Sequence, residues 1–199
     1  MMEKEKVRLF QNLFETRQDV YPVQYIKSDG SVGYYPAKQK SGKYCQPTTK
    51  TYRDHLLGQR TIGVYQPIPQ NNSPPVTPFV SLDLDREKFP FKEKMQDTLR
   101  NFVQLRRVNE VPVCVEISRS GNEYHLWILF ETPAEACKGR KTAIRLFEIA
   151  RVDRATCKIY PKQDWLDETG HELGNLIALP LMDEAVLFKT HAPSRKVLK

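Results

Sequence analysis

Two aspartates one residue apart, Asp83 and Asp85, end an apolar run at residues 79–85. Because side chains alternate across a β-strand, the two carboxylates lie on one face, about 7 Å apart, and the apolar residues lie on the other. Carboxylates at that spacing repel each other unless a cation lies between them, and Mg²⁺ or Mn²⁺ prefers such hard oxygen donors. The pair therefore predicts a divalent-metal site, or else two ordinary acids where a strand runs into solvent.

A polar loop further along the chain carries groups that bind phosphate. Its residues are Ser118, Arg119, Ser120, Gly121 and Asn122. The loop combines two hydroxyls and a guanidinium with a glycine, which lets backbone N–H groups approach an anion. His125 follows on a strand, on the face opposite its apolar neighbours, so it shares the open sheet face with the loop. These residues predict a phosphate site; the alternative is a polar hairpin turn beside an ordinary histidine.

A lysine and another carboxylate, Lys162 and Asp164, close a later strand. A third acid beside the first pair would complete a site for two metal ions, which activate a hydroxyl and stabilise in-line attack on phosphorus. Asp164 could equally be a loop residue, and Asp153 or Asp167 could supply the ligand instead. Three acids, a phosphate-type loop and a histidine on a small sheet are together typical of a nucleotidyl transferase.

The elements that must position these side chains follow one another from residue 79 onward. Apolar spacings of three and four residues predict one helix, and a capping box with proline at the first helical position predicts another. β-rich runs predict the strands, of which the middle two form a hairpin. The expected ranges are strands 79–85, 111–117, 124–130, 156–160 and 176–179, and helices 91–102 and 133–151. The order β-α-β-β-α-β predicts an α/β (α+β) fold, an antiparallel-rich sheet under two helices in an RRM-like or ferredoxin-like arrangement.

The N-terminal part is more polar and contains fewer clear patterns. An Asp-Gly turn predicts a hairpin of residues 23–27 and 32–35, and a glycine ends a short helix expected at 51–58. Residues 66–78 contain five prolines and two asparagines. Such a stretch predicts a connector without regular structure. The interpretation is an N-terminal α/β lobe with its connector, residues 1–78, and a catalytic lobe, residues 79–199, forming one module.

Composition narrows the classes of protein. The chain has 199 residues, of which 40% are hydrophobic, and its 31 lysines and arginines against 24 acids give a net charge of +7. A basic excess favours a polyanionic partner such as nucleic acid or a nucleotide. No apolar run approaches the roughly 20 residues that cross a bilayer, and the charged start lacks a secretory signal, which favours an intracellular protein. The four cysteines form no CxxC pair, and no P-loop motif is present.

Six ordered motifs between about Leu13 and Leu181 resemble the archaeo-eukaryotic primase superfamily. The similarity is closest to the primase-polymerases of TOTE conflict systems and CRISPR-associated operons. The motifs are Leu13-Phe14 with Asp19-Val20-Tyr21; His55-Leu56-Leu57-Gly58 with Thr61-Ile62-Gly63-Val64-Tyr65; Leu82-Asp83-Leu84-Asp85; Ser118-Arg119-Ser120-Gly121-Asn122 with His125-Leu126-Trp127; Tyr160-Pro161-Lys162-Gln163-Asp164; and Gly174-Asn175-Leu176-Ile177-Ala178-Leu179-Pro180-Leu181.

The resemblance implies a primase fold, with an RRM-like catalytic lobe and an N-terminal α/β lobe. It implies template-directed primer synthesis or extension from NTPs or dNTPs on single-stranded DNA, in the cytoplasm of a prokaryote. Further implied partners are the primer strand and a helicase or CRISPR adaptation proteins. The family's motifs place two Mg²⁺ or Mn²⁺ ions on Asp83, Asp85 and Asp164, and the nucleotide on Ser118, Ser120 and His125. Arg119, Gly121 and Lys162 are added as phosphate contacts on their chemistry and position.

Template contacts and rival functions complete the hypothesis. Lys38, Lys40, Lys43 and Arg53 could track template phosphates, or they could form an ordinary solvated surface. The main rival is a non-catalytic RRM-like module that binds single-stranded nucleic acid, which would expose aromatic side chains on its sheet. The face of residues 79–85 instead carries carboxylates, which favours the enzyme. A nicking endonuclease with paired histidines and a nucleotide-sugar transferase on a doubly wound sheet fit the sequence less well.

Overall fold

The computed structural model describes residues 2–109, 113–118, 123–167, 172–180 and 186–187. The helices are α1 (Met2–Phe14), α2 (Thr49–Leu56), α3 (Lys92–Asn109) and α4 (Ala136–Ala150), with short 3₁₀ turns at Arg86–Lys88 and Arg154–Thr156. The strands are β1 (Pro22–Ile26), β2 (Val32–Pro36), β3 (Gly63–Tyr65), β4 (Ile68–Gln70), β5 (Ser73–Leu84), β6 (Val113–Ile117), β7 (Tyr124–Glu135), β8 (Cys157–Tyr160), β9 (Leu176–Ala178) and β10 (Val186–Leu187). Within these ranges, none of the helices combines the length and apolar character that a bilayer crossing requires.

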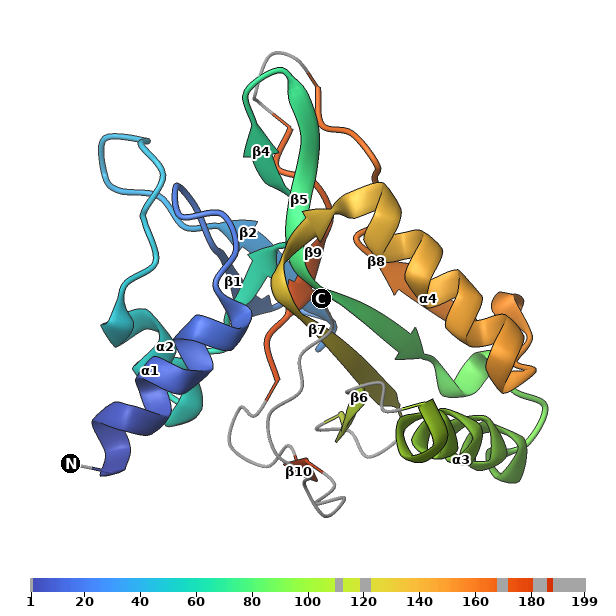
Figure 1. Cartoon of the computed structure of the whole chain (residues 1–199). Helices are drawn as coiled ribbons and strands as arrows, with labels where there is room; N and C mark the ends of the chain where they lie inside the picture. The colour runs from blue at the N-terminus through green and yellow to red at the C-terminus, as the bar shows by residue number, and fades with distance from the viewer. Residues whose placement is uncertain (1, 110–112, 119–122, 168–171, 181–185, 188–199) are drawn as a thin grey trace.

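A six-stranded antiparallel sheet forms the centre of the molecule (Figure 1). Strand β5 pairs with β7 on one edge and with β8 on the other, and β7 pairs in turn with β6. The chain order β5-α3-β6-β7-α4-β8 with the spatial order β8-β5-β7-β6 is the ferredoxin-like arrangement that the sequence predicts. Strands β4 and β10 extend this sheet, and the small sheets β1–β2 and β3–β9 lie outside it.

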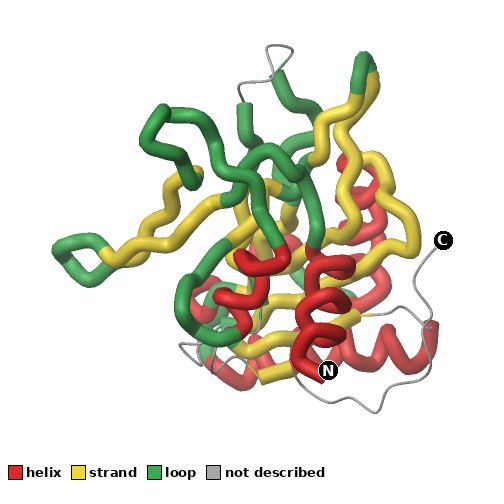
Figure 2. Tube along the Cα trace, turned by 90° about the vertical axis from the view of Figure 1, so that its left-hand side faces the viewer, coloured by secondary structure: helices red, strands yellow, loops and turns green. Residues whose placement is uncertain are grey.

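The two faces of the central sheet are covered by different parts of the chain. Helices α3 and α4 pack on one face, and α1 and α2 lie on the other side together with the N-terminal strands (Figures 1 and 2). Each face has its own cluster of buried residues. Under α3 and α4 these include Val80, Leu82, Leu84, Met95, Phe102, Leu126, Ile128, Leu146 and Phe147. Under the N-terminal elements they include Val7, Phe10, Phe14, Tyr52, Ile62, Phe79, Trp127 and Ile177.

Several sequence predictions hold at the level of elements. The hairpin expected near residues 23–35, the short helix near residue 50 and the β6–β7 hairpin are all present. The helix expected at 91–102 is α3, but it begins after Phe91, whose side chain is exposed. Helix α1 was not predicted, although Val7, Phe10 and Phe14 have helical spacing and are buried.

Two predictions at strand ends are wrong. The proline-rich segment was expected to lack regular structure, but it forms the β4–β5 hairpin around a turn with Asn72 at φ 52°. The prolines are accommodated because β4 pairs only with the first part of β5, and the register shifts at Pro78 between Thr77 and Phe79. The capping box expected at residues 132–135 is part of β7, because Ala134 and Glu135 pair with β5, so α4 begins at Ala136.

Residues from the end of the described chain close the N-terminal cluster. Strand β9 pairs with β3, and the Leu179 N–H donates to the Ile62 carbonyl over 3.0 Å. The buried His55 links the same segments: its Nδ1 accepts from the Ile62 N–H over 3.3 Å, so its Nε2–H donates to the Pro180 carbonyl over 2.9 Å. Strand β5 also crosses the expected lobe boundary at residue 78. The division into lobes at that residue stays a prediction.

Replacing His55 by leucine should destabilise the protein by about 1–3 kcal/mol, because the buried Ile62 N–H and Pro180 carbonyl lose their partners. Urea unfolding at pH 7.5 measures this free energy. Leu57→Ala, at an exposed residue beside the same helix, should change it little.

The same variant predicts a pH dependence. Burial lowers the pKa of His55. As pH falls through the unfolded-state pKa near 6.5, His55 becomes protonated in the unfolded chain but stays neutral in the folded chain. The unfolded state is then favoured, and the stabilisation is lost. The stability difference between wild type and His55→Leu should narrow between pH 7.5 and 5.5. A constant difference would show that His55 is not held neutral.

Candidate active site

Four charged side chains form one row across the central sheet. Asp83 on β5 is directly opposite His125 on β7 and directly opposite Lys158 on β8, and Glu116 on β6 is opposite His125. Residues opposite each other in an antiparallel sheet project from the same face. The row therefore reads Lys158, Asp83, His125, Glu116, with charges of alternating sign, on the face away from α3 and α4.

The position of the row along the strands follows from the N-terminal elements. Ser81, two residues before Asp83 on β5, is opposite Trp127, two residues after His125 on β7. Both are buried. Phe14 of α1 contacts the Trp127 ring at 5.2 Å between centroids. The N-terminal elements thus cover the sheet as far as Trp127, and the charged row lies beyond their cover.

The carboxylates of Asp83 and Asp85 both face Lys158. The Lys158 Nζ lies 2.6 Å from Asp85 Oδ2 and 3.8 Å from Asp83 Oδ2, and the two aspartate side chains are 18% and 16% exposed. Burial raises the pKa of the Asp83 carboxyl, and the negative charge of Asp85 raises it further. His125 and Lys158 lower it, but the pKa is raised overall. Hydrogen bonding to Asp85 raises the pKa of Lys158. The aspartate pair is therefore a concentrated negative site that already attracts one cation.

His125 is held between two carboxylates. Its Nδ1 lies 3.2 Å from Glu116 Oε2 and its Nε2 lies 3.7 Å from Asp83 Oδ1. The same Glu116 oxygen accepts a hydrogen bond from Trp127 Nε1 over 3.0 Å. Because an ionised carboxylate only accepts, His125 Nδ1 donates, and the ring presents Nε2 toward Asp83.

The charge of His125 depends on these neighbours. Burial is the largest effect and disfavours the imidazolium, but the hydrogen bond and charge of Glu116, with Asp83 and Glu123, raise the pKa of His125 overall. Glu123 itself has a raised pKa, because it is partly buried and lies near Asp83 and Asp85. His125 thus has a raised pKa and lies among Glu116, Glu123 and Asp83 on the face of the sheet away from α3 and α4.

The structure does not bring the expected third carboxylate to this group. Asp164 pairs with Arg140 of α4, with 2.7 Å between Nη1 and Oδ1. Helix α4 packs on the opposite face of the sheet from Asp83. Asp153 accepts from the Ala155 N–H, and Asp167 accepts from the Glu172 N–H. Among the described residues no three His, Cys, Asp or Glu side chains are grouped as metal ligands. A third ligand at Asp164 stays a prediction.

The predicted phosphate contacts are placed only in part. Ser118 Oγ accepts from the Glu123 N–H over 3.2 Å and closes the loop between β6 and β7. Arg119, Ser120 and Gly121 lie outside the described residues. Lys162 is exposed, and its Nζ lies 4.9 Å from the centre of the Tyr160 ring.

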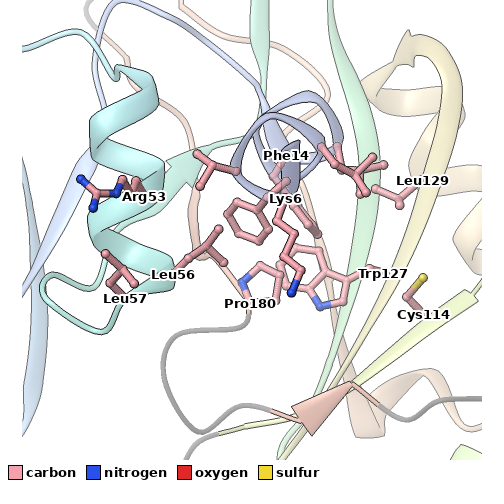
Figure 3. A pocket seen from close by; sticks show the side chains of 13 residues that line it. Lys6, Phe14, Arg53, Leu56, Leu57, Cys114, Trp127, Leu129 and Pro180 are labelled. Carbon is pink, nitrogen blue, oxygen red and sulfur yellow. The ribbon is translucent and has the colours of Figure 1, made fainter. Parts of the chain in front are cut away.

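The predicted template contacts lie in the N-terminal part. Lys38, Lys40 and Lys43 are exposed in the loop after β2, and Lys38 Nζ lies 5.3 Å from the centre of the Tyr44 ring. Arg53 lies on α2 at the edge of an apolar cavity of about 490 Å³ between α1, α2 and the sheet (Figure 3). Apolar side chains such as Phe14, Leu56 and Trp127 dominate that cavity, and Lys6 and Arg53 are the charged residues among its described lining.

Sequence reasoning missed Glu116, Glu123 and Lys158. Glu116 could have been found, because it stands two residues before Ser118 and His125 stands two residues after Glu123. A hairpin closed by Ser118 and Glu123 makes Glu116 and His125 opposite partners. Lys158 requires the register of β5 with β8, strands distant in sequence, and no local pattern provides that register.

Replacing Glu116 by glutamine should lower the pKa of His125, because the amide keeps the size of the side chain but loses its charge. NMR titration of the histidine ring carbons in metal-free protein measures this pKa. Glu131→Gln, at an exposed residue of the same strand β7, should leave it unchanged. An unaltered His125 titration in Glu116→Gln would contradict the assigned hydrogen bond.

Comparison with protein families gives a nearly full-length match. The family model described as "TOTE conflict system, Archaeo-Eukaryotic Primase domain" matches residues 5–191. A comparison with curated proteins gave no match. The family match includes every residue of the charged row and the mixed fold that carries it. The chain belongs to the family of archaeo-eukaryotic primase domains of TOTE conflict systems.

Proposed function

We propose that this chain is a primase-polymerase that joins nucleotides by metal-dependent transfer, directed by a single-stranded DNA template. Membership of the primase family makes a nucleotidyltransferase-like enzyme the general class. The observation that carries the specific proposal is the row of Asp83, His125 and Glu116, with Asp85 beside it. It brings paired carboxylates and an imidazole of raised pKa to one partly exposed end of the sheet, as transfer of a nucleotide from a triphosphate requires.

The donor chemistry of the aspartate pair fits Mg²⁺ or Mn²⁺. Both carboxylates are hard oxygen donors, and both turn toward a single cation, the ammonium of Lys158. Burial and the neighbouring charge of Asp85 raise the pKa of Asp83, so a second positive charge nearby would stabilise the carboxylate form of Asp83. When bound, divalent ions would lower the pKa of an attacking 3′-hydroxyl and neutralise the triphosphate.

The chain's own residues would orient the nucleotide. His125, held by Glu116, which raises its pKa against the effect of burial, would donate from Nε2 to a phosphate oxygen when protonated. Ser118, Arg119, Ser120 and Lys162 are the proposed further phosphate contacts. Lys158 would neutralise part of the charge of the aspartate pair until the substrate arrives, because its ammonium lies 2.6 Å from Asp85 and 3.8 Å from Asp83.

The non-catalytic binding module fits this face less well. Such a module needs exposed rings on its sheet to stack bases. Here Phe79 and Trp127 of that face are fully buried under the N-terminal elements, and Tyr160, which is opposite Ser81, is partly buried against the same cluster. The accessible end carries carboxylates instead, and these repel a nucleic-acid backbone when no cation is bound.

Asp83→Ala and Asp85→Ala should each reduce synthesis at least about a hundredfold, because each removes a proposed ligand. The assay is primer synthesis on single-stranded DNA with labelled NTPs or dNTPs, with and without a supplied primer. The folded state should persist, since losing one acid relieves repulsion, and circular dichroism checks this. Asp97→Asn, at an exposed acid on α3, is the matched control.

The outcomes of that assay separate the candidate functions. Product from the wild type but not from the aspartate variants supports the proposal. Product that forms only when a primer is supplied restricts the proposed activity to primer extension. Normal synthesis by a folded Asp83→Ala protein contradicts the site. No product in either format, with the DNA still bound, would favour the binding module.

Removal of divalent metal should abolish synthesis, and Mg²⁺ or Mn²⁺ should restore it. A direct readout is the paramagnetic resonance signal of free Mn²⁺, which falls as the ion binds to protein. Wild type should bind Mn²⁺ with an affinity that falls at least about tenfold in Asp83→Asn. Equal Mn²⁺ binding by the two proteins would place the metal elsewhere.

A further inference from the structure

The β1–β2 hairpin exposes aromatic rings that the core does not use. The pairs Val23–Tyr35 and Tyr25–Gly33 put these side chains on one face of the hairpin. Val23 is buried, but further along the same face Tyr25 and Tyr35 are 42% and 50% exposed. Their ring centres lie 5.7 Å apart with 53° between the planes. The hairpin projects from the rest of the fold (Figure 2), so the rings are open to a partner.

Exposed apolar side chains are concentrated on this hairpin. Ile26 and Val32, which face each other next to the turn, are also exposed. The two rings and this pair therefore leave four large apolar side chains in solvent within eleven residues of chain. The rings lie on one face of the hairpin and this pair lies on the other, so both faces expose apolar side chains.

Gly33 fixes the position of the Tyr25 ring. A Cβ atom at Gly33 would meet Cζ of that ring at 2.5 Å, so the ring lies directly against the backbone of β2. This contact orients the ring before any ligand arrives, which lowers the entropy cost of binding. The hairpin therefore offers a preoriented Tyr25 ring rather than a flexible side chain.

A cavity of about 450 Å³ lies beside the rings, between the hairpin and residues 58–61. Tyr25, Tyr35 and Arg60 line it together with two glutamines, and no acid is among its described lining residues. Arg60 is exposed. Aromatic faces, amide groups and a guanidinium together suit a nucleotide, whose base stacks while its phosphate binds the cation.

The charge around the cavity favours a polyanion. Residues 22–61 contain seven lysines and arginines against two aspartates, a net charge of +5 out of +7 for the whole chain. Lys27 lies next to the hairpin turn, and Lys38, Lys40 and Lys43 follow in the next loop, all four exposed. Most of the excess positive charge thus lies in the segment that also exposes the rings.

We infer that the β1–β2 hairpin with residues 58–61 is a binding surface for single-stranded nucleic acid. Unpaired bases stack on Tyr25 and Tyr35, and the adjoining phosphates contact Arg60 and the hairpin lysine, Lys27. A duplex hides its base faces, so the surface discriminates against it. The inference rests on the proposed function only in giving the bound strand the role of template.

Substitution of both tyrosines by leucine should weaken binding of a labelled mixed-sequence single strand about tenfold, measured by fluorescence anisotropy. Substitution of both by phenylalanine should keep wild-type affinity, because the stacking faces remain. Gly33→Ala should weaken binding as well, since the new methyl displaces the Tyr25 ring. Phe91→Leu, at an exposed ring before α3, should have no effect.

Salt dependence separates stacking from charge. Arg60→Gln should reduce the slope of log affinity against log salt concentration by about 0.7, the value for one phosphate contact of a single strand. The tyrosine variants should leave the slope unchanged. Lys92→Gln, which removes one exposed charge from α3, should leave both slope and affinity unchanged.

The inference is overturned if the leucine variants bind as wild type does, or if duplex binds equally well and the variants do not alter it. These results are independent of catalysis. Loss of binding in the hairpin variants while wild type makes no product would refute the proposed function alone. Wild-type synthesis with unimpaired binding by the hairpin variants would refute the hairpin surface alone.

Discussion

Strand β5 pairs on both edges, with β7 and with β8, and its strict alternation of side chains decides what lies on each face of the molecule. Leu82 and its apolar neighbours face α3 and α4, and this burial fixes the register, since a slip of one residue would exchange the two faces. The same register puts Asp83 on the other face and opposite two cations. The charged row therefore depends on the hydrophobic packing behind it.

The alternating signs of Lys158, Asp83, His125 and Glu116 explain how so many ionisable groups are accommodated in a sheet. A buried carboxylate without a partner is costly, and Glu116 is almost fully buried, but it accepts from both His125 and Trp127. Trp127 in turn packs against α1. Trp127 therefore connects the N-terminal hydrophobic cluster to His125 in two ways, through its hydrogen bond to Glu116 and through its own ring, whose centre lies 6.3 Å from that of the imidazole.

The sequence was informative where the determining pattern is local. Alternation in residues 79–85 and 124–130 predicted that the side chains of Asp83, Asp85 and His125 lie on the face of the sheet opposite the apolar side chains. The order of elements predicted the confirmed fold. Sequence patterns failed where tertiary pairing overrides them. The prolines before Phe79 join a strand at a register shift, and Thr132 to Glu135 extend β7 rather than cap a helix. Glu116 was available from the spacing of the β6–β7 hairpin and was missed, whereas Lys158 emerges only from the register of β5 with β8, which composition and spacing do not encode.

The pairing of β3 with β9 has a consequence for the way the protein is made. Val64 faces Ile177, and His55 meets Pro180, across more than a hundred residues of intervening chain. During synthesis the N-terminal cluster therefore stays open on one side until residues 176–180 leave the ribosome, whereas the β5-to-β8 unit already has all its strands. The domain that contains the charged row can thus form first, and the N-terminal elements then close over Trp127 as the last strands arrive.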